Sequence, residues 1–199
     1  MIYNFIKEKF PFDIHAAPWK ITTSLPQLIE AMLPTLGDDY NIKNGVAIHS
    51  TATLGHDVTI KAPAIIGPHC FVGTHSYLRG GVYLAEGSKV GIGCEIKQSI
   101  IMNRSAVAHF NFIGDSIIGC DVNFEAGSIT ANHYNERKDK NIVVTYQGQR
   151  ISTCVDKFGA LVGDGCRIGA NAVTSPGTLL PPDSIVGRLQ LIEQNPQSD

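Results

Sequence analysis

Residues 46–78 read VAIHSTATLGHDVTIKAPAIIGPHCFVGTHSYL and carry a repeat with a period of six. Counted in steps of six, ten successive positions are aliphatic: Ile48, Leu54, Ile60, Ile66, Val72, Leu78, Leu84, Val90, Ile96 and Met102. The residues two places before them are small or β-branched: Ala52, Val58, Ala64, Cys70, Ser76, Val82, Ser88 and Cys94. Two registers thus share one period, which indicates a structural repeat.

A period of six fits neither an α-helix nor the simple alternation of a strand. It is typical of short strands joined by tight turns, in which three hexapeptides form one triangular coil of about 18 residues. The aliphatic side chain points inward and the small residue occupies the corner. The sequence therefore predicts an all-β fold, a left-handed parallel β-helix. We expect its frame to slip between Ala108 and Ile118 and to return from Val162 to Val186.

Three segments surround or interrupt this repeat. Residues 1–45 are predicted to form an N-terminal helical segment, with one amphipathic helix that starts at a capping box on Ser24 and ends before Gly37. The β-helix is expected over 46–187, with a short helical segment before it and a protruding loop and hairpin at about 131–158. Within that excursion, residues 142–151 resemble a hairpin. Residues 188–199 are expected to be a C-terminal tail.

The composition excludes several classes of function. Only 17% of residues are charged, the formal net charge is −2, and no run of like charges occurs, so we expect no nucleic-acid or membrane partner. Five scattered cysteines predict neither a disulfide framework nor a metal site. The N-terminal sequence shows no signal-peptide core and no long apolar run, which predicts a soluble, cytoplasmic protein.

Two features are candidates for chemistry. Arg79 and Lys97 are 18 residues apart and each follows an inward aliphatic residue, so they are predicted to stack on one face about 4.8 Å apart. The pair is either a solvated basic pair or a phosphate clamp. His109 lies where the frame slips, and is either a general base or a structural histidine. Glu95, 14 residues earlier, could orient its imidazole.

Residues 108–134 read AHFNFIGDSIIGCDVNFEAGSITANHY. This segment resembles the acetyltransferase half of the bifunctional glucosamine-1-phosphate acetyltransferase / N-acetylglucosamine-1-phosphate uridyltransferase enzymes, and the resemblance spans about residues 46–140. Residues 156–187 are more similar to archaeal-type sugar-phosphate nucleotidyltransferases that bear the same β-helix. The resemblance implies a homotrimer with its active site between subunits and acetyl-CoA as cosubstrate, whereas residues 1–45 are expected to hold no uridyltransferase domain.

The resemblance assigns an acceptor side and a catalytic base. His109 corresponds to the base and Glu95 to the carboxylate near it. Arg79 and Lys97 correspond to residues that bind the sugar phosphate, in agreement with their stacking. Asn123 corresponds to a residue that holds the sugar.

The resemblance also assigns a cofactor side. Two positions correspond to residues on the acetyl-CoA side: Ala126, which offers its backbone N–H, and Asn132. His133, which follows Asn132, is assigned to the same side. Lys138 corresponds to a basic residue that reaches toward an adjacent subunit's site.

Three positions depart from the family pattern. Phe112 replaces a substrate-binding tyrosine whose hydroxyl helps to hold the phosphate, His133 replaces the tyrosine after Asn132, and Glu125 replaces a glycine. The expected function is an acetyl-CoA-dependent N-acetyltransferase that acts on an amino-sugar phosphate such as glucosamine-1-phosphate. The departures keep two alternatives open: a non-catalytic trimeric scaffold or regulatory homologue, and an acyltransferase for a different amino or nucleotide sugar.

Overall fold

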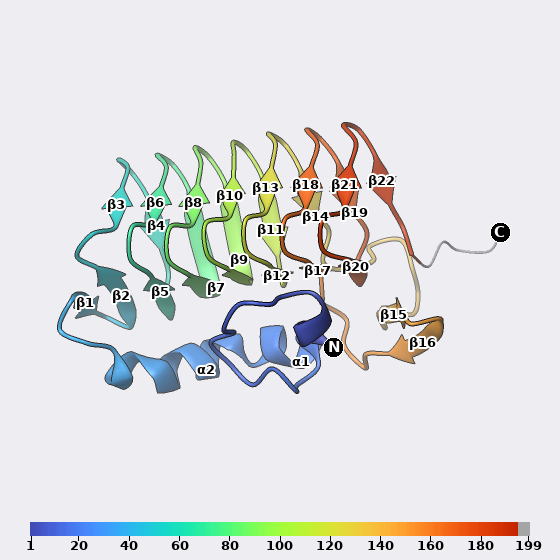
Figure 1. Cartoon of the computed structure of the whole chain (residues 1–199), viewed down its shortest axis with the longest axis horizontal. Helices are drawn as coiled ribbons and strands as arrows, with labels where there is room; N and C mark the ends of the chain where they lie inside the picture. The colour runs from blue at the N-terminus through green and yellow to red at the C-terminus, as the bar shows by residue number, and fades with distance from the viewer. Residues whose placement is uncertain (195–199) are drawn as a thin grey trace.

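The computed structural model of the chain describes residues 1–194 and confirms the predicted left-handed parallel β-helix (Figure 1). The first face consists of β2 (Val46–His49), β5 (Ala64–Ile66), the C-terminal halves of β7 (Tyr77–Leu84) and β9 (Glu95–Ile101), β12 (Ile117–Ile118), β17 (Ala160–Val162) and β20 (Thr178–Leu180). The second face consists of β3 (Thr53–Leu54), β6 (Phe71–Val72), β8 (Lys89–Val90), β10 (Ala106–Val107), β13 (Asn123–Phe124), β18 (Arg167–Ile168) and β21 (Ile185–Val186). The third face consists of β4 (Thr59–Ile60), the N-terminal halves of β7 and β9, β11 (Phe112–Gly114), β14 (Ile129–Thr130), β19 (Val173–Thr174) and β22 (Leu191–Ile192).

The repeat positions fill the interior of the prism as the period of six predicts. Ile66, Val72 and Leu78 are fully buried in one cluster that runs through the coils. The expected inward position of Met102 is wrong, because Ile101 pairs with Leu84 and is the buried residue of that core. Met102 lies instead in a second apolar cluster outside the prism.

The frame slips earlier than expected because one corner of the prism is shortened. In β7 the chain turns this corner with two glycines, Gly80 and Gly81, both at positive φ. In β9 a single residue, Gln98 (φ 49°), makes the same turn, so the register shifts by one between Arg79 and Val82. The next coil keeps the shorter corner, with Asp115 at φ 46°.

The N-terminal segment lies along the outer side of the first face (Figure 1). It contains η1 (Ile2–Asn4), α1 (Pro18–Thr23), α2 (Leu25–Met32) and η2 (Leu33–Thr35), and β1 (Tyr40–Lys43) then pairs antiparallel with β2. The predicted amphipathic helix is present as α2, which begins directly after Ser24, but the prediction of a single helix with a capping box is wrong. The backbone N–H of Ser24 donates to Lys20 O at the end of α1, and its side chain makes no cap hydrogen bond. Leu25 and Ile29 pack with Ile65 in the second cluster, so the first face is buried on both sides.

The excursion contains the predicted hairpin. β15 (Val143–Tyr146) pairs antiparallel with β16 (Gln149–Ser152), and the chain re-enters the prism at β17. Phe158, just before β17, packs its ring against Trp19 of α1 with the centroids 6.0 Å apart. The ladder continues through β22, beyond the expected end of the β-helix at 187, and residues 195–199 of the expected tail lie outside the described residues. No helix within residues 1–194 has the length and apolar character needed to cross a membrane.

Candidate active site

The predicted stack of two cations is confirmed, but each cation has its own acidic partner. Arg79 and Lys97 are paired in register on β7 and β9. The Nε atom of Arg79 donates to Oε1 of Glu95 at 2.7 Å, and the ammonium of Lys97 donates to Oδ2 of Asp115. The two cations therefore lie in a row of two ion pairs with no net charge, rather than in an open basic clamp.

Asp115 is the central residue of this row and the sequence interpretation missed it. Its side chain is only 3% exposed. Oδ2 accepts hydrogen bonds from both Lys97 and the amide of Asn132. A further step of 18 residues from Lys97 reaches Asp115, but the shortened corner makes Gly114 the register partner of Lys97, so this spacing does not predict the contact.

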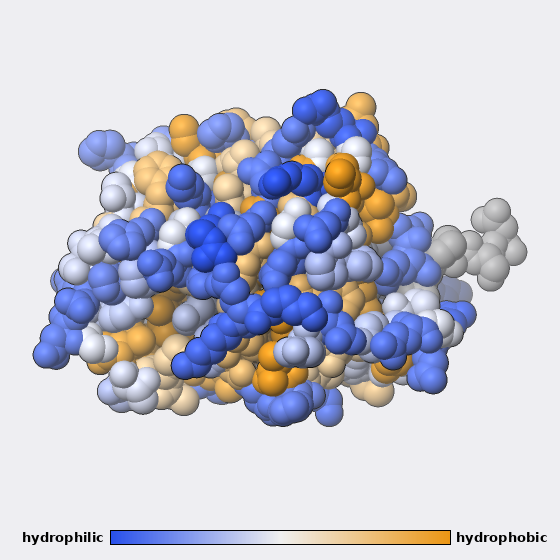
Figure 2. All heavy atoms as spheres, viewed as in Figure 1, coloured by the Kyte–Doolittle hydropathy of each residue, from blue (hydrophilic) through white to orange (hydrophobic). Residues whose placement is uncertain are grey.

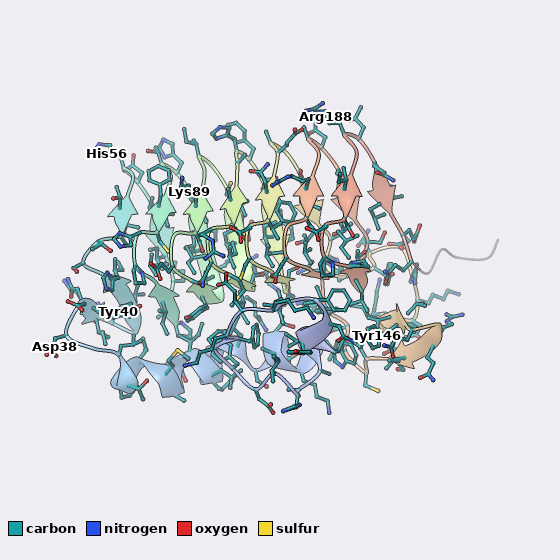
Figure 3. All side chains as sticks on the ribbon, viewed as in Figure 1. Asp38, Tyr40, His56, Lys89, Tyr146 and Arg188 are labelled. Atoms are coloured by element: carbon teal, nitrogen blue, oxygen red, sulfur yellow. The ribbon has the colours of Figure 1, made fainter. Side chains whose placement is uncertain are left out.

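His109 occupies the turn between the second and third faces. It lies two residues past Val107, whose ladder partner in the next coil is Phe124, so Ala126 holds the equivalent position of that coil. His56 and Arg188, labelled in Figure 3, hold this turn position near the two ends of the β-helix, and His109 lies in the row of turns between them. The imidazole of His109 is exposed and thus accessible to a ligand.

The turn before His109 is fixed by a close backbone approach. A Cβ atom added to Gly91 would lie 1.7 Å from the carbonyl oxygen of Ala108. The carbonyl of His109 accepts a hydrogen bond of 2.8 Å from the N–H of Gly127. The N–H of Ala126 donates no hydrogen bond to any group within the described part of the chain, so it is available to a ligand.

Glu95 does not contact the imidazole in this chain. Among the described residues no hydrogen bond or ion pair joins it to His109, and its carboxylate is engaged by Arg79 instead. Phe112 is the register partner of Glu95 in the next coil. Its ring lies 2.7 Å from where a Cβ on Gly114 would be, so Phe112 leans along the third face toward Asn132.

Asn123 lies on the second face, on the other side of the His109 turn. It borders a groove of about 220 Å³ together with Arg167 and Arg188. Arg188 donates to both oxygens of Glu125 at 2.8 and 2.7 Å, and these hydrogen bonds hold the pKa of Glu125 below its ordinary value. Glu125, which departs from the family pattern, therefore joins two coils.

A larger cavity of about 710 Å³ lies between the third face and the excursion. Lys97 and Asp115 line it from the β-helix, and Lys140 and Lys157 line it from the excursion. His133 is not among its lining residues; its Nδ1 lies 3.3 Å from Oδ1 of Asn132. Lys138 is exposed on the excursion.

The structure thus places the predicted residues in distinct regions of one chain. Arg79, Glu95, Lys97, Phe112 and Asn132 line the third face, and His109 and Ala126 lie at its turn with the second face. Asn123 lies on the second face and Lys138 on the excursion, and neither joins the third-face group. Neither of the two cavities described above encloses all of them.

The cysteines of the repeat are core residues. Burial raises the pKa of Cys70 to about 11, and it also raises the pKa values of Cys94 and Cys166. Cys120 is buried as well, and its pKa is raised to about 12. Within residues 1–194 no group of three or more His, Cys, Asp or Glu side chains is arranged to hold a metal ion.

Comparison with known proteins agrees with this architecture. A family described as "Hexapeptide repeat of succinyl-transferase" matches residues 63–97 and 159–187. These two segments therefore match a hexapeptide repeat, in agreement with the β-helix.

The chain's relatives include proteins described as bifunctional. It is 36% identical over 80% of its length to the "Bifunctional sugar-1-phosphate nucleotidylyltransferase/acetyltransferase" of Sulfurisphaera tokodaii, of which it covers 41%. It is 31% identical over 89% of its length to the "Bifunctional protein GlmU" of Methanococcus vannielii, of which it covers 43%. The chain thus spans less than half of each of these relatives.

Proposed function

We propose that the protein is an acetyl-CoA-dependent N-acetyltransferase that acts on an amino-sugar phosphate such as glucosamine-1-phosphate. One arrangement carries the proposal: an exposed histidine, His109, lies at the edge of a face with two register-paired cations, Arg79 and Lys97. The sequence similarity to bifunctional proteins with an acetyltransferase function supports the same reaction class.

The transfer needs a base and an oxyanion donor. The acceptor amine attacks the thioester carbonyl carbon, and His109 takes the proton that the amine loses. The oxyanion of the tetrahedral intermediate accepts a hydrogen bond from the N–H of Ala126, which has no other acceptor within the described residues. The carbon–sulfur bond then breaks, and the departing thiolate of CoA takes the proton back from His109.

Binding roles are assigned to two faces. Arg79 and Lys97 on the third face hold the phosphate of the acceptor, and Asn123 on the second face contacts its sugar. Phe112 offers an apolar ring to the substrate where a hydroxyl would have bound the phosphate. Glu95 acts by holding the guanidinium of Arg79, to which it is bonded.

The cofactor side of the site lies beyond Phe112. Asn132, His133 and Lys138, together with the N–H of Ala126, are assigned to acetyl-CoA. The side-chain amide of Asn132 donates a hydrogen bond to Asp115. This hydrogen bond holds the amide in one position, which supports a role in binding the cofactor.

A homotrimer would complete this site. Phe110, beside His109, is 71% exposed, and Ile92 and Leu189 in the same row of turns are 45% and 79% exposed. Figure 2 shows apolar residues among the polar ones along the edge where these turns lie. A neighbouring subunit would cover this apolar row and bring its own residues beside His109. We place this assembly in the cytoplasm.

One observation favours a different acceptor as the second candidate. Both cations of the third face are already paired with carboxylates, so an incoming phosphate dianion meets a row of no net charge. An amino sugar or nucleotide sugar that places no phosphate at this row would bind without displacing these pairs.

The test compares His109→Ala with His56→Ala, which removes an exposed histidine from the same turn position of the first coil. CoA release from acetyl-CoA is measured by chromatography with phosphorylated and unphosphorylated amino sugars. The proposal expects His109→Ala to lose at least about 100-fold in kcat and His56→Ala to match the wild type. Equal rates in both variants would refute the role of His109. If calorimetry of the wild type shows no heat with CoA or any amino sugar, the scaffold function replaces the enzyme.

A further inference from the structure

Asp115 joins two segments that the strand ladder does not place in register. Lys97 belongs to β9, and its register partner in the next coil is Gly114. Asn132 lies two residues past β14, at the start of the excursion. Both side chains donate to the same oxygen, Oδ2 of Asp115.

We propose that Asp115 is a positioning residue that couples the acceptor side of the site to the acetyl-CoA side, by holding the Lys97 ammonium and the Asn132 amide at one carboxylate oxygen. The proposal rests on the function proposed above. It deepens that function, because one side chain then controls the binding of both substrates.

The backbone of this turn is held without the Asp115 side chain. Its N–H donates to Lys97 O at 2.8 Å, and its carbonyl accepts from the N–H of Gly159 at 3.0 Å. The coil of β7 turns the same corner with Gly80 and Gly81, which carry no side chain. The fold therefore does not need a carboxylate at this corner.

The energetic cost of burying this charge also indicates that the Asp115 carboxylate has a role other than forming the turn. A buried carboxylate is unfavourable unless charged and hydrogen-bonded partners compensate it. Here the partners are Lys97, 13% exposed, and Asn132, 8% exposed. Lys97 and Asp115 form part of the wall of the cavity beside the excursion, whereas Asn132 is not among its lining residues. The carboxylate thus fixes one donor in the wall of an open cavity and a second, buried donor outside that wall.

The connection continues from Asn132 toward the acetyl-CoA side. With its amide nitrogen held by Asp115, the Oδ1 atom of Asn132 faces Nδ1 of His133 at 3.3 Å. Loss of the carboxylate therefore frees Lys97 on one side and lets the Asn132–His133 pair reorient on the other.

The experiment measures KM for glucosamine-1-phosphate and for acetyl-CoA in four variants. Lys97→Met is expected to raise only the acceptor KM, and Asn132→Ser only the acetyl-CoA KM. Asp115→Asn is expected to raise both by about tenfold, the effect of losing a hydrogen bond to a charged group. The double variant Lys97→Met/Asp115→Asn removes both buried charges together, which favours folding. It is expected to keep the raised acetyl-CoA KM, with an acceptor KM no higher than that of Lys97→Met alone.

The matched control is Asp164→Asn, far from the site. Asp164 accepts hydrogen bonds from the N–H groups of Cys120 and Lys7, so its loss changes the melting temperature but neither KM. If the wild type turns over and Asp115→Asn changes one KM or neither, the coupling is refuted and the enzyme function stands. If the wild type binds both compounds without turnover, the enzyme function is refuted. The coupling is then tested by the Kd values for CoA and glucosamine-1-phosphate: it stands if Asp115→Asn raises both Kd values and is refuted if it raises one or neither.

Discussion

Arg79 and Glu95 bind each other across neighbouring coils, with the guanidinium Nε 2.7 Å from the carboxylate Oε1. Their side chains are 38% and 35% exposed. The pair therefore orients the guanidinium at the surface of the third face at little cost in desolvation.

Glu95→Gln tests whether this glutamate serves Arg79 or His109. We expect the acceptor KM to rise about twofold to fivefold, the range for an exposed pair, with the kcat and its pH profile unchanged. Arg79→Met should raise the same KM at least as much. A fall in kcat with an altered pH profile in Glu95→Gln would show instead that the carboxylate acts on His109.

The close approach at Gly91 predicts a large effect of a single methyl group. In Gly91→Ala the new Cβ would lie 1.7 Å from the carbonyl oxygen of Ala108, so the backbone before His109 must move. We expect a loss of about 1–3 kcal/mol in the free energy of unfolding, measured by urea denaturation. Gly37→Ala is the control, because nothing lies within 4 Å of its Cβ; equal stability of the two variants would contradict the packing of these coils.

The thiols should differ sharply in reactivity. Cys154 is exposed, whereas Cys70, Cys94, Cys120 and Cys166 are buried. Burial raises the pKa of Cys70 to about 11 and that of Cys120 to about 12, so neither forms a thiolate near neutral pH. We expect a thiol reagent to modify one cysteine in the folded protein and none in Cys154→Ser. Rapid modification of a second thiol would show that the prism opens.

Arg104 should contribute a stability that depends on pH. It binds Glu8 of the N-terminal segment and Asp121, and both carboxyl groups have pKa values held below their ordinary 4.5 and 3.8 by hydrogen bonds from Arg104. A carboxyl group whose pKa is lowered by folding stabilises the fold when the pH is above its ordinary pKa. This stabilisation is lost as the pH falls through the lowered pKa. The difference in melting temperature between wild type and Arg104→Met is therefore expected to be constant near neutral pH and to shrink below these values. Arg150→Met, on the exposed hairpin, is the control and should show no such trend.

The sequence predicts the interior of the prism well because one side chain in six must point inward. It fails at the shortened corner for a specific reason. Ile100, Ile101 and Met102 are consecutive aliphatic residues, so a count by six still finds an aliphatic residue after the frame has moved by one. Only the register of Leu84 with Ile101 reveals the shift.

The candidate site could be predicted only in part. Spacing places Arg79 and Lys97 in one stack, and the structure confirms it. The contacts of Asp115 could not be assigned, because the position of Asp115 depends on the shortened corner and that of its second donor, Asn132, on where the excursion leaves the prism. The pairing of Glu125 with Arg188 likewise spans the whole excursion, and no fixed spacing predicts it.

The N-terminal segment has a consequence for how the molecule unfolds. Coils of a solenoid contact only their neighbours, so such a fold can lose its terminal units one by one. Here Pro26 of α2 packs against Gly81, Thr22 accepts a hydrogen bond from Gln98, and the carbonyl of Phe5 accepts one from Asp164, several coils further along. One continuous stretch of chain thus binds the coils of Gly81 and Asp164, which do not touch each other, as well as the coil of Gln98 between them. Because this segment links coils that could otherwise separate one by one, the coils it binds are expected to unfold together.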